Sequence, residues 1–156
     1  MSEVDGGVLD RLGRAQALAV QGRRDAARTL YTELYAEALG AGDAYWACVA
    51  AHFVAHMHSA PAAQRDWHLR ALHAAEAVGD ARVAAFYPSL HANLAEVYLR
   101  LHAPAQARAH LAEARAAAQR LPPGTGDPSA GLLIERVAQA LAGAGAVDLD
   151  GINLAL

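Results

Sequence analysis

The sequence predicts an all-α fold, a short right-handed stack of about three antiparallel helix pairs closed by a C-terminal capping helix. Apolar residues recur at steps of three and four along most of the chain, which is the spacing of one helix face. Strand formers are scarce, since isoleucine occurs only at Ile134 and Ile152, and alanine carries much of the 54% hydrophobic content. Alanine is the best helix former, so close-packed helices are favoured.

A Gly-Asp pair recurs at 42–43, 79–80 and 126–127, and we expect each pair to separate two helices. The glycine can take the left-handed conformation that closes a helix. The aspartate can accept from the free N–H groups of the helix that follows. The interval of 37 residues between the first two aspartates suits a two-helix repeat.

The first helix pair is expected at 8–20 and 23–39, after acidic, glycine-rich residues 1–7 that should fray. Gly22 ends the first of these helices. The expected inward residues are Leu9, Leu12, Ala15, Leu18 and Ala19, and then Ala27, Leu30, Tyr31, Leu34 and Ala38.

The second pair is expected at 44–59 and 62–78, restarting at Pro61. Its first helix is apolar nearly all round, so we expect it to be sandwiched between neighbours. The inward residues of its second helix are His68, Leu72, Ala75 and Val78.

The third pair lies within 79–119 and turns at His102-Ala103-Pro104. Pro104 suits a first helical position, where its missing N–H costs nothing. Pro88 predicts a kink or a delayed helix start near Tyr87. The two apolar stripes are Leu90, Leu94, Tyr98 and Leu101, and Ala107, Leu111, Ala114 and Ala118.

A capping helix is expected from Asp127-Pro128 to about Leu141, which completes a single domain over residues 1–145. Gly143 and Gly145 then release a flexible apolar tail, residues 146–156. Its near-alternating pattern suits an extended segment that docks within the chain or onto a second copy, giving a homodimer. The inward residues of the capping helix are Leu132, Leu133, Val137 and Leu141.

The third pair resembles a tetratricopeptide repeat, and small actinobacterial proteins of this helical-repeat type look similar across most of the chain. The matching residues are Leu94, Ala95 and Tyr98 on the first helix and Ala107, Leu111 and Ala114 on the second. His102 stands where the family has a turn glycine, and the repeats are longer than the usual ones of about 34 residues.

The resemblance implies a binding or scaffold module that holds a peptide or partner protein in a concave groove lined by the first helices. No phosphate loop, nucleophile elbow or paired-carboxylate motif is present, which favours this reading over an enzyme. The expected lining residues are Trp46, Val49, Phe53, His56, Ser89, Asn93 and Glu96.

Charge and composition limit the classes of partner and the cellular location that we expect. The net charge of −3 argues against nucleic acid, since a phosphate backbone demands clustered positive charge. No apolar run approaches the roughly 20 residues of a membrane span, and no signal peptide is visible. A single cysteine, Cys48, cannot form an internal disulfide and is expected to be an inert buried thiol. A cytoplasmic protein is therefore expected.

Eight histidines offer the alternative, a small all-α enzyme or a small-molecule or metal binder with a His/Tyr-lined pocket. His52 and His56 are four residues apart, on one helix face, and could share a metal ion. Tyr87 and His91 lie together on the next repeat and could converge with that pair for acid–base chemistry. Because only two ligands share a face and no HExxH or cysteine cluster supports them, no metal and no cofactor is expected.

Overall fold

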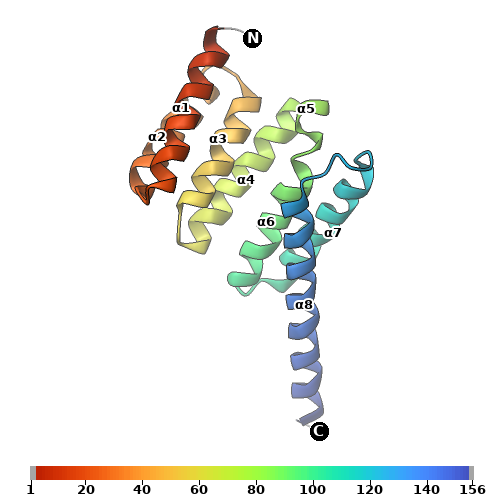
Figure 1. The fold of residues 1–156 in the computed structure, drawn as a ribbon. Coiled ribbons are helices and arrows are strands. Elements are labelled where there is room, and N and C mark those ends of the chain that lie inside the picture. Colours follow the sequence, from red (N-terminus) through yellow and green to blue (C-terminus); the bar gives the residue numbers. More distant parts are fainter. Residues whose placement is uncertain (1–2, 155–156) are drawn as a thin grey trace. The chain divides into compact units, whose positions relative to one another are not determined.

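The computed structural model is all-α and describes the backbone of residues 3–154 and the side chains of residues 6–143. Over that range the chain forms eight helices and no strand, which confirms that the fold is all-α (Figure 1). None of the described helices combines the length and apolar character needed to cross a bilayer. The helices fall into two compact units, residues 1–83 (unit 1) and residues 84–156 (unit 2).

Unit 1 is built from four long helices, each packed on the next in sequence (Figure 1). Its core joins α1, α2 and α3 through buried residues that include Leu12, Tyr31, Leu34 and Val54. The helices are α1 Glu3–Val20, α2 Arg24–Gly40, α3 Ala44–Met57 and α4 Pro61–Val78, followed by the short α5 Ala81–Ala84 at the boundary of the unit.

The helices of unit 1 match the predicted ones except in α1. That helix begins at Glu3, so residues 3–7 are helical where fraying was expected. Leu9, expected on the inner face, is 45% exposed, because the face that packs on α2 centres on Leu12 and Ala15. As predicted, α3 is sandwiched, since it packs on both α2 and α4.

Unit 2 contains α6 Tyr87–Arg100, α7 Pro104–Arg120 and α8 Pro128–Leu154, with α8 packed on both other helices. Pro88 sits in the first turn of α6, which confirms the delayed start near Tyr87. Pro104 likewise opens α7. The core of the unit is Ala92, Ala95, Ala107, Leu111, Ala114, Ile134, Val137 and Leu141.

Two inward assignments in unit 2 are wrong. The fourth buried residue of the α7 stripe is Ala117, and Ala118 is exposed. Leu132 is 75% exposed, because the buried stripe of α8 passes through Ile134 and Val137 and turns Leu132 to the opposite side.

In all three Gly-Asp pairs the aspartate caps the following helix, but the glycine is left-handed in only two of them. Asp43 accepts from the backbone N–H of Trp46, Asp80 from that of Arg82 and Asp127 from that of Ser129, as predicted. Gly42 and Gly79 have φ of 70° and 62°. The third glycine, Gly126, is not left-handed, because α7 already ends at Arg120 and Gly124 makes the turn in the loop that follows.

The last helix is longer than expected. α8 continues to Leu154 and runs beyond the end of α6 (Figure 1), where we expected an extended segment from residue 146. A glycine costs a helix only about 1 kcal/mol relative to alanine, so Gly143 and Gly145 among alanines do not end it. Residues 155 and 156 and all side chains from 144 onward lie outside the described residues, and so does the docking expected of the tail.

The turn between α6 and α7 has a histidine in the place of a glycine. His102 has φ of 57°, and the next residue, Ala103, donates its N–H to the carbonyl of Tyr98. The same hydrogen bond closes the α2–α3 turn, from Asp43 to Ala38, where Gly42 takes the left-handed position. A side chain in this conformation costs roughly 1–2 kcal/mol, less for residues that tolerate it.

The variant His102→Gly is therefore expected to raise the free energy of unfolding by up to about 1 kcal/mol. Gly42→His is the reciprocal control, because a Cβ at Gly42 meets no atom within 4 Å, so its cost reports backbone strain alone. Urea melts of both variants measure the two changes. A loss of stability in His102→Gly would mean that the histidine side chain stabilises the turn by more than its backbone costs.

Candidate functional site

The candidate site lies on α3, whose composition leaves large side chains half-buried beside a buried alanine face. Ala47, Ala51 and Ala55 are fully buried, and the small size of alanine lets α3 pack closely on its neighbours. The bulky residues of the helix fall on a second stripe. Trp46, Val49 and Phe53 are half-buried on that stripe, and His56 is exposed at its end.

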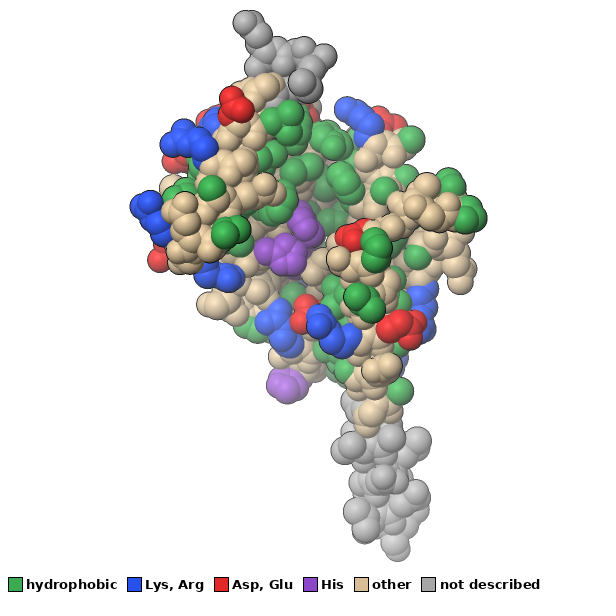
Figure 2. Space-filling view, viewed as in Figure 1, with side chains coloured by type: hydrophobic (Ala, Val, Ile, Leu, Met, Phe, Trp, Pro, Cys, Tyr) green, Lys and Arg blue, Asp and Glu red, His purple; other side chains and the backbone are tan. Residues whose placement is uncertain are grey.

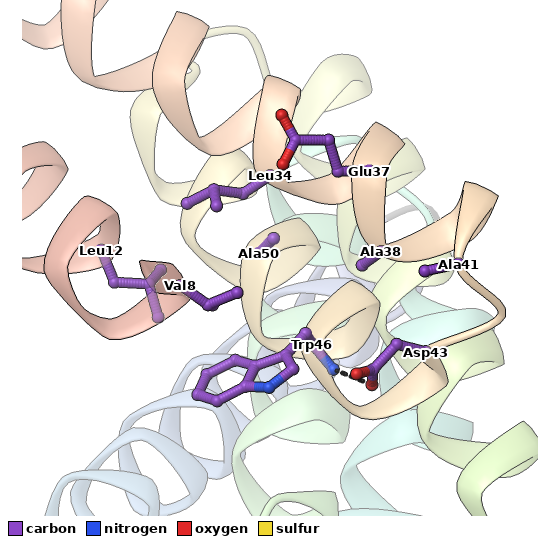
Figure 3. A pocket seen from close by; sticks show the side chains of 9 residues that line it. All are labelled: Val8, Leu12, Leu34, Glu37, Ala38, Ala41, Asp43, Trp46 and Ala50. Carbon is purple, nitrogen blue, oxygen red and sulfur yellow. Dashed lines mark hydrogen bonds between the residues drawn. The ribbon is translucent and has the colours of Figure 1, made fainter. Parts of the chain in front are cut away.

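An apolar pocket opens at the N-terminal end of this stripe. It has a volume of about 190 Å³ and is formed by α1, α2, α3 and the α2–α3 turn (Figure 3). The indole of Trp46 lies on one side of it, across from Leu34 of α2. The lining residues are Val8, Leu12, Leu34, Glu37, Ala38, Ala41, Asp43, Trp46 and Ala50.

Local structure holds the pocket's walls in place. Asp43 accepts from the backbone N–H of Trp46 at 3.1 Å and so fixes the first turn of α3, which carries the indole. Arg11 of α1 donates twice to Glu37 of α2, at 2.5 and 3.0 Å. The hydrogen bonds from Arg11 lower the pKa of Glu37, so this carboxylate stays ionised and joins the two helices beside the pocket.

The other end of the stripe is anchored by rings. Phe53 stacks on Tyr31 of α2, with ring centroids 5.0 Å apart and planes 11° apart. Tyr31 is 1% exposed and belongs to the core of the unit. The ring of Phe53 is therefore partly exposed and is held in place by the buried ring of Tyr31.

Three histidines meet between α3 and α4. His52 and His56 have ring centroids 4.6 Å apart, and His68 of α4 lies 6.0 and 5.3 Å from them. Figure 2 shows histidine side chains next to hydrophobic ones on one face of the protein. Burial, and then the charge of His56, lowers the pKa of His52 to about 4, so His52 is neutral at pH 7. His68 lies inward, as predicted, but its position beside His52 and His56 was not predicted.

Other predicted groups of unit 1 lie apart from the pocket. Cys48 is buried, as predicted, and burial raises the pKa of its thiol to about 11, which disfavours the reactive thiolate. His58 stacks on Trp67 of α4 instead of joining His56, with centroids 6.5 Å apart. The guanidinium of Arg70 covers the same indole at 4.3 Å.

The predicted residues of α6 lie in unit 2. Asn93 is only 7% exposed, and its side-chain amide donates to the backbone carbonyl of Ser89 at 2.8 Å. Asn93 therefore supports the helix and offers little surface to a partner. Glu96 is half-exposed beside Arg100 and lines an open hollow between α6 and α8 with Leu99, Arg136, Val137 and Ala140.

Tyr87 and His91 stack with ring centroids 6.2 Å apart. The partner of His91 is a residue that the sequence analysis did not single out, His110 of α7, whose Nδ1 lies 3.1 Å from the Nδ1 of His91. The available signal was symmetry about the turn, since His91 lies seven residues before Tyr98 and His110 lies seven residues after Ala103, the two residues whose hydrogen bond closes the turn.

In the part of the chain with described side chains, no group of three histidine, cysteine or carboxylate residues is arranged to hold a metal ion. We predict that the purified protein binds no stoichiometric transition metal, because only two candidate ligands, His52 and His56, share a helix face and stable sites take three or four protein ligands. Elemental analysis after dialysis measures this. About one zinc, copper or nickel per chain, lost in His56→Ala, would show that the three histidines rearrange into a site.

No protein-family model, curated protein or solved structure matches this chain. The function is therefore inferred from the geometry of the site.

Proposed function

We propose that the chain is a TPR-like binding module that holds a peptide or partner protein along α3 of unit 1. The observation that carries this proposal is the apolar pocket beside Trp46, at one end of a stripe that continues through Val49 and Phe53 to His56. A row of half-buried aromatic and aliphatic side chains on a rigid helix is typical of an interaction surface.

The size of the pocket supports a side-chain anchor. A cavity of about 150 Å³ is large enough to bind benzene, so 190 Å³ accommodates one large apolar side chain of a partner. Partners that dock through such an anchor derive most of their affinity from a few central contacts. The net charge of −3 favours a protein or peptide partner over nucleic acid.

The proposal is tested by selecting peptides from a displayed random library on the full chain and measuring their affinity by fluorescence anisotropy. Trp46→Ala should weaken the selected peptides by about ten- to thirty-fold, as expected for loss of a central aromatic contact. Val20→Ala is the control, since Val20 is 89% exposed in the same unit and lies outside the pocket. Failure to enrich any peptide, or equal binding by both variants, would refute the proposal.

The alternative is an enzyme or small-molecule binder that uses His52, His56, Tyr87 and His91. His52 and His56 contact His68 between α3 and α4, and His91 contacts both Tyr87 and His110 in the α6–α7 hairpin. Neither group carries an observation that favours catalysis over packing. We therefore keep the binding module as the proposed function.

A further inference from the structure

The α6–α7 hairpin of unit 2 contains a direct contact between two imidazoles. The Nδ1 atoms of His91 and His110 are 3.1 Å apart, which is a hydrogen-bond distance. Such a contact needs one hydrogen between the two nitrogens, so one ring donates and the other accepts. Both rings are half-buried.

Each imidazole of the pair also stacks on a tyrosine of α6. Tyr98 of α6 stacks on His110, with centroids 5.4 Å apart and planes 6° apart. Tyr87 stacks on His91 at 6.2 Å and 23°. The two imidazoles themselves are tilted by only 30° at 5.3 Å. Four aromatic rings from two helices thus fix the two nitrogens facing each other.

The protonation states of the pair follow from this geometry. In the neutral pair, the donor ring carries its proton on Nδ1 and the acceptor ring carries its proton on Nε2. One added proton can go to the Nε2 of the donor ring, which leaves the hydrogen bond intact and makes it charge-assisted. A second proton has only the accepting Nδ1 left, so two N–H groups and two positive charges would then face each other at the same distance.

We propose that the His91–His110 contact is an acid-sensitive latch in unit 2, closed while one proton lies between the two facing nitrogens and opened once both rings are fully protonated. The latch joins α6 to α7, the two helices of a single hairpin. Opening it separates the two facing nitrogens, whose rings also stack on Tyr87 and Tyr98 of α6.

The surroundings of the pair set the direction of the response. Burial is the main cause that lowers the pKa of each ring, and the charge of His110 lowers the pKa of His91 further. Among the described residues, the charged side chains of unit 2 that act on the rings lie on α7: Glu113 raises the pKa of both rings, and Arg120 lowers the pKa of His91. The latch is therefore closed at neutral pH and opens on acidification.

Nitrogen-15 NMR of the imidazole rings tests the latch directly on the full chain. At pH 7.5 we expect one of His91 and His110 to be in the Nδ1–H form and the other in the Nε2–H form. On acidification the pair should titrate in two steps separated by about one unit or more, as strongly interacting sites do. Two Nε2–H rings that titrate independently would overturn the proposal.

Hydrogen exchange of the α6 and α7 backbone amides is a second test, because it measures how often the hairpin opens. Between pH 7.5 and 5, protection of these amides should fall further in the wild type than in His110→Gln, because only the wild type can bring two positive charges to the facing nitrogens. Glutamine can still donate to His91 but does not titrate. His73→Gln, at an exposed position of α4, should follow the wild type. An equal loss of protection in wild type and His110→Gln would also overturn the latch.

Discussion

Replacing Leu94 with alanine is expected to lower the free energy of unfolding by about 2–5 kcal/mol. Leu94 is 0% exposed on α6, in the stripe that also contains the buried Leu90. Truncation removes buried methyl groups and leaves a cavity, and a tightly packed helix pair cannot collapse to fill it. The buried residues of α7, which packs on α6, are mainly alanine, and alanine is too short to fill the space.

Leu132→Ala is the matched control for this experiment. It makes the same chemical change on a helix of the same unit, but Leu132 is 75% exposed. Urea melts should show a change within about 0.5 kcal/mol for the control. A loss below about 1 kcal/mol in Leu94→Ala, the cost of an average point substitution, would remove Leu94 from the core and undermine the repeat alignment on which the TPR-like proposal depends.

The helices could be predicted because the signals that form them are local. Periodic apolar residues, the prolines at the first turns of α4, α6 and α7, and the capping carboxylate of Asp43 all act within one turn of the chain. The same is true of the α6–α7 turn, which forms although His102 replaces a glycine. Burial was predicted wrongly where apolar residues lie on two faces of a helix, as at Leu132. The end of a helix was predicted wrongly where the helix continues through glycines, as in α8.

The candidate site could be predicted only in part, because the side chains that face α3 come from other helices. The stripe of Trp46, Val49 and Phe53 is visible as spacing on one helix. The pocket beside it is not, since Val8 and Leu12 reach it from a helix more than 30 residues away. His68 and His110 were missed for the same reason, because spacing within a helix carries no information about which side chain of the next helix lies opposite.

Acid should destabilise unit 1 through His52. Burial lowers the pKa of this histidine from 6.5 to about 4, so the unfolded chain takes up a proton at higher pH than the folded one. The stabilising effect of the neutral, buried ring is present in full above about pH 6.5 and is lost as the pH falls toward 4. At about 1.4 kcal/mol per pKa unit, the loss over that window is about 3 kcal/mol.

Urea melts at intervals from pH 7 to pH 4 measure this loss, with His52→Gln as the test variant. Glutamine removes the titrating group, so the variant should lose about 3 kcal/mol less than the wild type over the same range, whatever its stability at pH 7. Carboxylates that titrate near pH 4 contribute equally to both proteins and cancel in the difference. His73→Gln, exposed on the neighbouring helix, should keep the slope of the wild type. Parallel curves for wild type and His52→Gln would mean that His52 reaches water and accepts a proton in the folded protein, and that the interior between α3 and α4 is open where the structure shows it closed.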